Sequence, residues 1–480
     1  MNVSRASAAD ISTPKAVIIV LYGASGDLAH RMVIPAIAEI RTRGLMPESW
    51  AMVASAREPL TDDEFRGRVR ESLAESSGGL PEDAEEILTH MYYASGRFGP
   101  RDESELPEML DRLYRDMWST AGQEPLVIHF LAVPPSGFRS VTEGLKVHDL
   151  VTESTRVVFE KPYGTDLKSF EQLDRDVKEV LAEEQIFRID HFLGKEGVQT
   201  IYVLRFANHL FGSEWSRHSV SQVQIDVPED LDVADRTDFY EQTGAALDML
   251  VTHLFQVLGQ VAMDPPFDIR NPEQILAERE RALRALRLDP AEVVLGQFEG
   301  YRDLEGVPDD STQDTFVAAR VWVDTDRWRG VPFLLRTGKR MALKAQRMTL
   351  VLRRPDGPLF DEDLEPNTIE VNFAGAGAVS LNIAVKKPGP EFTFSSGRAR
   401  LDLNDVPLSE ALSPYASLIH DVLTGDRSLF TTADGLRAAF EAFAPLQGDE
   451  RPDPQPYAPG SWGPAAAAEL AFPHRWMLGQ

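Results

Sequence analysis

The segment KAVIIVLYGASGDLAHRMVIPAIAEI, residues 15–40, decides the fold class expected for this chain. Residues 16–22 are uniformly apolar and predict a buried strand, which ends at the turn GASG of residues 23–26. A buried strand that passes through a glycine turn into a helix is typical of dinucleotide-binding α/β domains. The apolar residues after the turn recur at helical spacing, at Met32, Ile34, Ile37 and Ile40.

The rest of the first 187 residues repeats this alternation of strand and helix. Apolar runs at residues 51–56, 125–135 and 156–164 predict further buried strands, and helical segments rich in charge follow the first of them. Strands that alternate with helices form a parallel sheet with right-handed crossover connections. We therefore predict an α/β, Rossmann-like coenzyme domain over residues 1–187.

The pattern changes in the second part of the chain. Residues 220–227, 315–323, 348–354 and 378–387 are strand-like, with long stretches between them. Strands without regular alternation with helices indicate a mostly antiparallel sheet. We predict a β+α domain with such a large sheet over residues 188–480, so that the whole chain is α/β plus α+β.

The composition excludes several classes of partner and chemistry. With 76 Asp and Glu against 49 Lys and Arg the formal net charge is −27, which argues against nucleic acid and against an anionic membrane surface. The apolar run at residues 16–24 is too short to span a bilayer and lacks signal-peptide flanks, so we expect a cytoplasmic protein. Without cysteine the chain has no disulfides, thiol catalysis or Cys-ligated metal.

The turn GASGDLA, residues 23–29, resembles a dinucleotide fingerprint, although its spacing differs from G-x-G-x-x-G. Glycines let the backbone approach a pyrophosphate, whose charge is favoured by the helix N-terminus. The alternative is a tight turn in which Asp27 caps the helix. The coenzyme contacts expected here are Gly23, Ala24, Ser25, Gly26, Asp27 and Leu28.

Arg57 stands just past the second predicted strand, where a dinucleotide-binding fold contacts the ribose of its coenzyme. An acidic residue there would accept a hydrogen bond from a 2′-hydroxyl, whereas an arginine would pair with a 2′-phosphate. The sequence therefore favours NADP. NAD stays possible because Glu58 is adjacent.

The stretch FRIDHFLGKEG, residues 187–197, gathers Arg188, His191 and Lys195 around Asp190 in an acidic chain. Taken alone, this stretch favours a solvated, charged turn before a helix. The other interpretation is a site that holds an anion or moves a proton.

Many short motifs occur in one order from about residue 16 to about residue 465. In this order the chain resembles the glucose-6-phosphate dehydrogenase family. The resemblance implies oxidation of the C1 hydroxyl of glucose 6-phosphate to a lactone, hydride transfer to NADP, no metal, and a homodimer or homotetramer formed through the large sheet. The motifs are GASGDLA, ASAREPLT, FLAVPP, RVVFEKPYG, RIDHFLGKE, LRFAN, DMLVTHLFQ, VAMDPP, RWRGVPFLLRTGK, KKPG and GSWGP.

The resemblance also implies roles for individual residues. His253 matches the general base and Asp190 the carboxylate that orients it, while Lys161 matches a lysine between coenzyme and substrate. Asp248 precedes His253 by five residues, about 140° away around an α-helix, so we do not expect these two to form a dyad. The substrate contacts implied by the family are Lys161, His191, Lys195, Glu229, Asp248, Lys339 and Lys344.

Four positions near the expected site depart from the family pattern. A tyrosine, an asparagine, an arginine and a glutamine of the family are replaced by Phe192, Thr252, His209 and Ala374. These changes leave other readings open: a dehydrogenase for another sugar or sugar phosphate, or a weakly active or inactive paralogue that acts as a regulator. The glucose–fructose oxidoreductase-like dehydrogenases, which share the E-K-P motif, are a further alternative.

Overall fold

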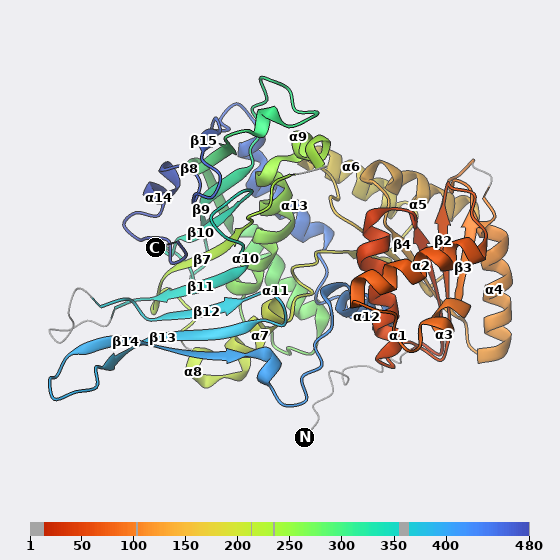
Figure 1. The fold of residues 1–480 in the computed structure, drawn as a ribbon, viewed down its shortest axis with the longest axis horizontal. Coiled ribbons are helices and arrows are strands. Elements are labelled where there is room, and N and C mark those ends of the chain that lie inside the picture. Colours follow the sequence, from red (N-terminus) through yellow and green to blue (C-terminus); the bar gives the residue numbers. More distant parts are fainter. Residues whose placement is uncertain (1–13, 102–103, 213, 234–235, 355–363, 480) are drawn as a thin grey trace.

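The computed structural model describes residues 14–101, 104–212, 214–233, 236–354 and 364–479. Two sheets lie at opposite ends of the molecule, with a layer of helices between them (Figure 1). One sheet is parallel and is built from the first part of the chain, and the other is mostly antiparallel. The predicted fold class is confirmed.

The first sheet has six parallel strands in the order β3-β2-β1-β4-β5-β6. This is the Rossmann order, in which the chain reverses direction beside β1. The strands are buried because helices cover both faces, which explains their uniformly apolar sequences. Four of them were predicted, and β3 and β6 were not. The strands are β1 (Ala16–Tyr22), β2 (Ser49–Ala56), β3 (Met91–Ser95), β4 (Leu126–Leu131), β5 (Thr155–Phe159) and β6 (Ile186–Arg188).

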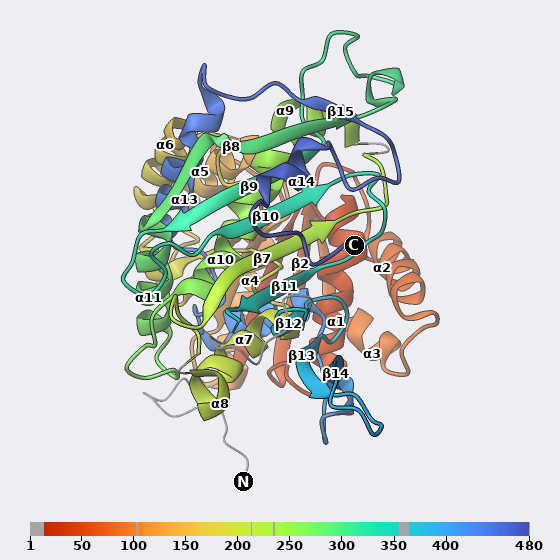
Figure 2. The same ribbon diagram turned by 90° about the vertical axis from the view of Figure 1, so that its left-hand side faces the viewer.

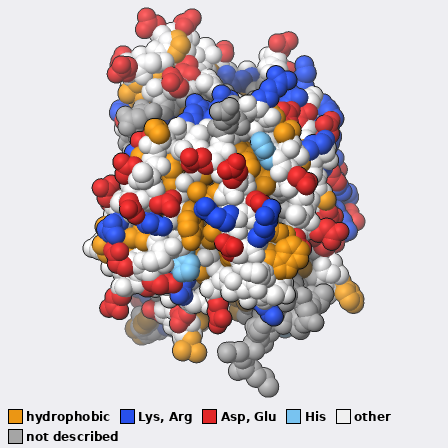
Figure 3. Space-filling view, turned by 90° about the vertical axis from the view of Figure 1, so that its right-hand side faces the viewer, with side chains coloured by type: hydrophobic (Ala, Val, Ile, Leu, Met, Phe, Trp, Pro, Cys, Tyr) orange, Lys and Arg blue, Asp and Glu red, His pale blue; other side chains and the backbone are white. Residues whose placement is uncertain are grey.

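Helices connect these strands and cover the sheet. The capping box of Thr61 and Glu64 starts the helix after β2. Figure 3 shows Lys and Arg side chains interspersed with Asp and Glu over the outer end of this domain. The helices are α1 (Ile34–Thr42), which follows a π-helical turn η1 (Ala29–Val33), α2 (Asp62–Ser77), α3 (Ala84–Thr89), α4 (Leu106–Ala121), α5 (Phe138–Val147) and α6 (Leu167–Lys178).

The second sheet has nine strands in the order β14-β13-β12-β11-β7-β10-β9-β8-β15. Only the pairs β7–β10 and β8–β15 are parallel among its neighbouring strands in the described chain. Strands β7, β9, β11 and β13 were predicted, and the others were not. The strands are β7 (Val220–Pro228), β8 (Leu286–Phe298), β9 (Phe316–Val323), β10 (Phe333–Gly338), β11 (Arg347–Leu352), β12 (Thr368–Asn372), β13 (Ala378–Lys386), β14 (Phe394–Asp402) and β15 (Gln455–Tyr457).

Helices on one face of this sheet separate it from the coenzyme domain (Figures 1 and 2). The helical run 237–262 is long and apolar enough to cross a membrane by composition, but 94% of its most apolar window is buried in the core of the protein. The helices of this part of the chain are α7 (Glu196–Ala207), α8 (His209–Gly212), α9 (Thr237–Ala246), the π-helix η5 (Leu247–Leu254), α10 (Phe255–Ala262), α11 (Pro272–Arg284), α12 (Pro414–Thr424) and α13 (Ala433–Phe443). Helix α14 (Ala466–Leu470) packs on β8 and β9 from the outer face of the sheet, away from the coenzyme domain (Figure 1).

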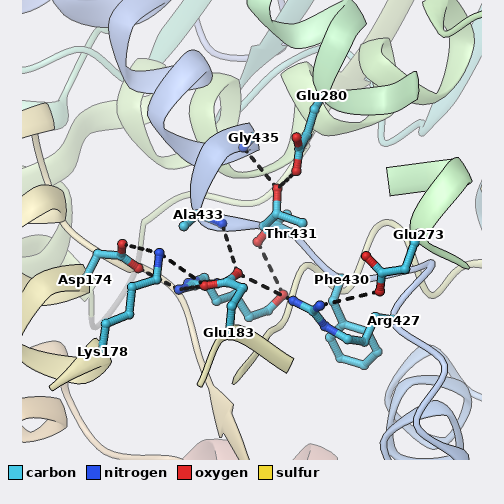
Figure 4. Close-up of polar contacts among 12 residues, drawn as sticks. Asp174, Lys178, Glu183, Glu273, Glu280, Arg427, Phe430, Thr431, Ala433 and Gly435 are labelled. Atoms are coloured by element: carbon cyan, nitrogen blue, oxygen red, sulfur yellow. Dashed lines mark hydrogen bonds and ion pairs between the residues drawn. The ribbon is translucent and has the colours of Figure 1, made fainter. Parts of the chain in front are cut away.

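A buried ionic network joins the two parts of the molecule. Arg188, at the end of β6, donates to Asp174 (2.6 Å) and to Glu183 (2.8 Å). Glu183 also pairs with Arg427 (3.4 Å) and accepts from the amide that begins α13 (Figure 4). Helix α12 packs back against α1, so the C-terminal part of the chain contacts the coenzyme domain in two places. The predicted domain boundary between residues 187 and 188 stays a prediction.

Candidate active site

The strand order places the expected site residues along one edge of the parallel sheet. Gly23 follows β1, Lys161 comes two residues after β5, and Asp190 two residues after β6. Because parallel strands end at the same edge, these residues lie at the carboxyl ends, where such sheets bind ligands.

The glycine turn requires glycine for a steric reason. Gly23 has a φ of +75°, its amide donates to the Ser55 carbonyl (2.9 Å), and a Cβ would lie 2.4 Å from the carbonyl oxygen of Ala132. A cavity of about 360 Å³ opens beside the turn, lined by residues 24–27 together with His30, Phe65 and Arg68. The turn therefore borders a cavity at the start of a helix, and pyrophosphate binding there stays a prediction.

Arg57 lies one residue beyond β2, and its side chain is exposed. Within the described residues its guanidinium has no recorded hydrogen bond or ion pair. Glu58, in contrast, is held by both nitrogens of the Arg68 fork. Arg68 was missed in the sequence because it stands on α2, eleven residues after Arg57.

His253 lies between an acid and an ammonium group. Its Nδ1 is 2.6 Å from Asp190 Oδ1, and its Nε2 is 2.6 Å from Lys161 Nζ. A lysine ammonium can only donate, so Nε2 accepts and Nδ1 carries the proton that is donated to Asp190. Both His253 and Asp190 are buried, and the Asp190 carboxylate accepts a second bond from the Phe192 amide (2.9 Å).

The helix that carries His253 is a π-helix, and the expected separation of about 140° from Asp248 is wrong for that reason. Hydrogen bonds from i to i+5 put more residues into each turn than an α-helix holds. Residues five apart therefore come close to one face of the helix. Lys161 Nζ contacts both members, at 3.1 Å from Asp248 Oδ1 and 2.6 Å from His253 Nε2.

Burial and the Lys161 ammonium hold the pKa of His253 well below its usual value, so its imidazole is neutral at pH 7. Burial raises the pKa of Asp190 to about 6, which still leaves it ionised at pH 7. Burial acts to raise the pKa of Asp248, but Lys161 prevails and lowers it. The arrangement can accept a proton at His253 Nε2 and stabilise the resulting charge at Nδ1.

Ligand atoms of Asp190, His191 and His253 lie within 4.8 Å of one another, a set that could in principle bind a metal ion. The acceptor atom Nε2 of His253 already contacts the Lys161 ammonium, and Nδ1 donates to Asp190. Both ring nitrogens of His253 are thus engaged by hydrogen bonds within the site.

His191 contacts His253 directly, and Lys195 lies beside it on the Phe192 ring. The His191 ring packs edge-on against His253, with centroids 4.6 Å apart, and Lys195 Nζ lies 4.4 Å from the centre of the Phe192 ring. Lys195 directly precedes α7 and donates to Gln346. The helix start sits tightly on β12, because a Cβ on Gly197 would lie 2.4 Å from the Asn372 carbonyl oxygen.

The nine-stranded sheet contributes a second group of side chains. Glu229 follows β7 and Lys339 follows the parallel strand β10, so their side chains meet at 2.5 Å. Lys344 is exposed in the next loop, and its charge lowers the pKa of Lys195 while that of Glu229 raises it. All three thus lie within electrostatic range of Lys195 or of one another.

Two of the departures from the family pattern are part of the helix of His253 or pack against its ring, and two are exposed. The Phe192 ring contacts both His253 and Lys195, and the Thr252 hydroxyl donates a hydrogen bond to the Asp248 carbonyl. His209 is exposed in α8, and Ala374 is exposed in the turn after β12. The sequence analysis missed Gln346, which contacts Lys195, and Tyr415, whose ring stacks on His191, because neither lies in a local motif.

Two family profiles together match almost the whole chain. “Glucose-6-phosphate dehydrogenase, NAD binding domain” matches residues 20–200, and “Glucose-6-phosphate dehydrogenase, C-terminal domain” matches residues 202–477.

Individual relatives match over similar lengths. Glucose-6-phosphate 1-dehydrogenase of Aggregatibacter actinomycetemcomitans is 33% identical over 94% of this chain and 95% of its own. The cytoplasmic glucose-6-phosphate 1-dehydrogenase 5 of Arabidopsis thaliana is 35% identical over 94% and 90%. A solved structure described as glucose-6-phosphate dehydrogenase in complex with its substrate glucose-6-phosphate covers 98% of this chain and 100% of its own, with a TM-score of 0.89 and 28% identity.

Proposed function

Because this chain belongs to the glucose-6-phosphate dehydrogenase family, we propose that it oxidises glucose 6-phosphate at C1 to 6-phosphoglucono-1,5-lactone with reduction of a nicotinamide dinucleotide. The observation that carries the proposal is the Asp190–His253–Lys161 chain of hydrogen bonds, at the same sheet edge as the glycine turn. A regulator without activity would not need a buried, oriented base.

His253 is the catalytic base in this proposal. Its Nε2 accepts the proton of the C1 hydroxyl as the C1–H bond releases a hydride and the C1–O bond becomes a carbonyl. The bound nicotinamide supplies the acceptor for that hydride. Asp190 keeps the imidazole in the tautomer whose free lone pair is at Nε2, and it stabilises the imidazolium that forms. Lys161 and Asp248 align the reacting hydroxyl beside Nε2.

The sugar phosphate is held by His191 and Lys195 in this proposal. Lys195 directly precedes α7, so its ammonium and the helix N-terminus act on the same anion. Glu229 and Lys344 act electrostatically on the same ammonium, and Lys339 pairs with Glu229; the three provide further polar contacts for the sugar phosphate in this proposal.

The function is tested by following coenzyme reduction with glucose 6-phosphate, other hexose phosphates and free hexoses. Glucose 6-phosphate is expected to give the highest kcat/KM. Preference for another sugar would replace the proposed substrate, and turnover of none of them would contradict the proposed enzyme.

We propose NADP as the preferred coenzyme, because Arg57 presents an exposed guanidinium where the adenosine ribose of a Rossmann coenzyme lies. Arg57→Ala is expected to raise KM for NADP by about 10- to 100-fold, since a charge-assisted contact to the 2′-phosphate is lost. KM for NAD serves as the internal control and should hardly change. Equal losses with both coenzymes would mean that Arg57 supports the fold instead.

The pH dependence should report the charge of Lys195. Burial lowers the pKa of this ammonium to about 8, so it loses its proton, and with it the attraction for phosphate, as the pH rises through that value. The kcat/KM for glucose 6-phosphate should therefore fall above pH about 8, whereas that for free glucose should lack this limb. Lys195→Arg should remove the limb, because arginine stays charged. An alkaline limb that persists in this variant would contradict the assignment.

The β13–β14 hairpin extends from the body of the protein at the edge of the large sheet (Figures 1 and 2). We propose that it forms the interface with a second copy of the chain, as a homodimer or within a homotetramer, which sedimentation equilibrium would distinguish. The apolar side chains that the hairpin exposes are Ile383, Val385, Phe392, Phe394 and Leu401.

We also propose a cytoplasmic location, in line with the Arabidopsis relative.

A further inference from the structure

An acidic side chain next to Arg57 should oppose NADP. Glu58 directly follows Arg57, so its carboxylate lies at the same end of β2. Such a carboxylate would repel a 2′-phosphate and would accept a hydrogen bond from the 2′-hydroxyl of NAD. Whether the Glu58 carboxylate is paired or unpaired therefore bears on which coenzyme the site favours.

The structure shows that this carboxylate is already engaged. Arg68 Nη1 donates to Glu58 Oε2 (2.7 Å) and Nη2 to Oε1 (2.5 Å), the two-pronged geometry that guanidinium and carboxylate favour. The same hydrogen bonds lower the pKa of Glu58, so it is ionised and paired. Both oxygens therefore face the Arg68 guanidinium on α2.

The main chain around Glu58 is fixed as well. The Tyr93 hydroxyl donates to the Glu58 carbonyl (2.6 Å), and the capping box of Thr61 and Glu64 holds the segment that follows. These contacts hold the main chain on both sides of the Glu58 side chain. The presence of Arg68 therefore determines whether the Glu58 carboxylate faces the coenzyme as a paired or an unpaired negative charge.

Arg68 lies at the coenzyme cavity itself. It lines the same cavity of about 360 Å³ as residues 24–27 of the glycine turn. Arg57 and the Arg68–Glu58 pair lie at this end of β2, and Glu64 also acts electrostatically on Arg68. The guanidinium of Arg57 is the unengaged one among these described side chains.

We propose that Arg68 is a positioning residue that sets coenzyme preference by holding the Glu58 carboxylate away from the ribose. This inference rests on the proposed function only in requiring a nicotinamide dinucleotide at the glycine turn. With Arg68 present, the 2′-phosphate contacts Arg57 next to the Glu58–Arg68 pair, whose charges cancel. Without it, Glu58 repels the phosphate and is free to accept from the 2′-hydroxyl of NAD.

The test is a double-mutant cycle read out by binding. Dissociation constants for NADP and NAD are measured calorimetrically, without sugar, for wild type, Arg68→Gln, Glu58→Gln and the double variant. Arg68→Gln should weaken NADP on the order of tenfold and tighten NAD, because an unpaired carboxylate is left. In the Glu58→Gln background the same substitution should change neither constant appreciably.

Arg70→Gln is the matched control. Arg70 stands on the same helix, makes the same kind of two-pronged pair with Glu85, and is 42% exposed against 43% for Arg68, but it does not line the cavity. It should leave both constants unchanged. Thermal midpoints of all variants report whether α2 is intact.

Three results would overturn the proposal. An equal loss of NADP affinity in both backgrounds would make Arg68 a direct phosphate ligand. An equal loss for both coenzymes would make it a structural residue, and no change at all would show that the pair is irrelevant. Sugar oxidation is measured separately, so its absence refutes the proposed function without deciding the role of Arg68.

Discussion

His253→Asn is expected to lower kcat with saturating glucose 6-phosphate by about 10²- to 10⁴-fold, the usual contribution of a positioned base. Asparagine fills much of the same space but offers no basic nitrogen where Nε2 now accepts from Lys161. Coenzyme binding should persist, because the glycine turn lies on a different element. The measurements are kcat from coenzyme reduction and the NADP dissociation constant.

Asp190→Asn should change kcat in the same direction. The imidazole would lose the anion that fixes its tautomer and stabilises its charged form, 2.6 Å from Nδ1. His209→Asn, at an exposed position in α8, is the control and should retain wild-type turnover. Near wild-type kcat in either site variant, with an unchanged thermal midpoint, would show that another group takes the proton.

Glucose 6-phosphate should be preferred over glucose by about 10²- to 10⁴-fold in kcat/KM. His191 and Lys195 offer two charge-assisted contacts, each contributing about 1.5–3 kcal/mol. The preference is expected although the family tyrosine is replaced by Phe192. Lys195 directly precedes α7, and its Nζ lies over the Phe192 ring. Steady-state kinetics with both sugars measure it.

Lys195→Ala should remove roughly 10- to 100-fold of this preference. The substitution should lower kcat/KM for glucose 6-phosphate and leave kcat/KM for free glucose unchanged. Lys168→Ala, an exposed lysine on α6, should leave both sugars unaffected. Phe192→Tyr should tighten the binding of glucose 6-phosphate only, because free glucose has no phosphate to accept the added hydrogen bond. If Lys195→Ala impaired both sugars equally, the cluster would be a structural turn and the phosphate site would lie elsewhere.

Much of the parallel sheet could be predicted because its strands are buried on both faces. Residues 16–22 carry seven buried side chains in a row, which only a covered strand needs. Strand β6 has three residues, too few for any periodic pattern. Strand β8 contains Pro290 and alternates exposed residues in its first half, so it lacks the continuous apolar run of a buried strand.

The site was predicted where it depends on order in the chain and was missed where it depends on contacts in space. Asp190 and His253 were expected together from the family resemblance, and in the structure they are hydrogen-bonded. The wide turn between Asp248 and His253 leaves no trace in the apolar spacing, which fits an ordinary helix equally well. Arg68 and Gln346 meet their partners through folding, with no local signal in the sequence.

The π-helix η5 has a consequence for how this chain can diverge. Relative to an α-helix it holds one extra residue, so deletion of a single residue between Asp248 and His253 would restore ordinary winding. That one change would rotate Asp248 and His253 relative to each other inside the buried helix, so that Lys161 Nζ could no longer contact both. The contact of one ammonium with two side chains is therefore only a single-residue deletion away from being lost.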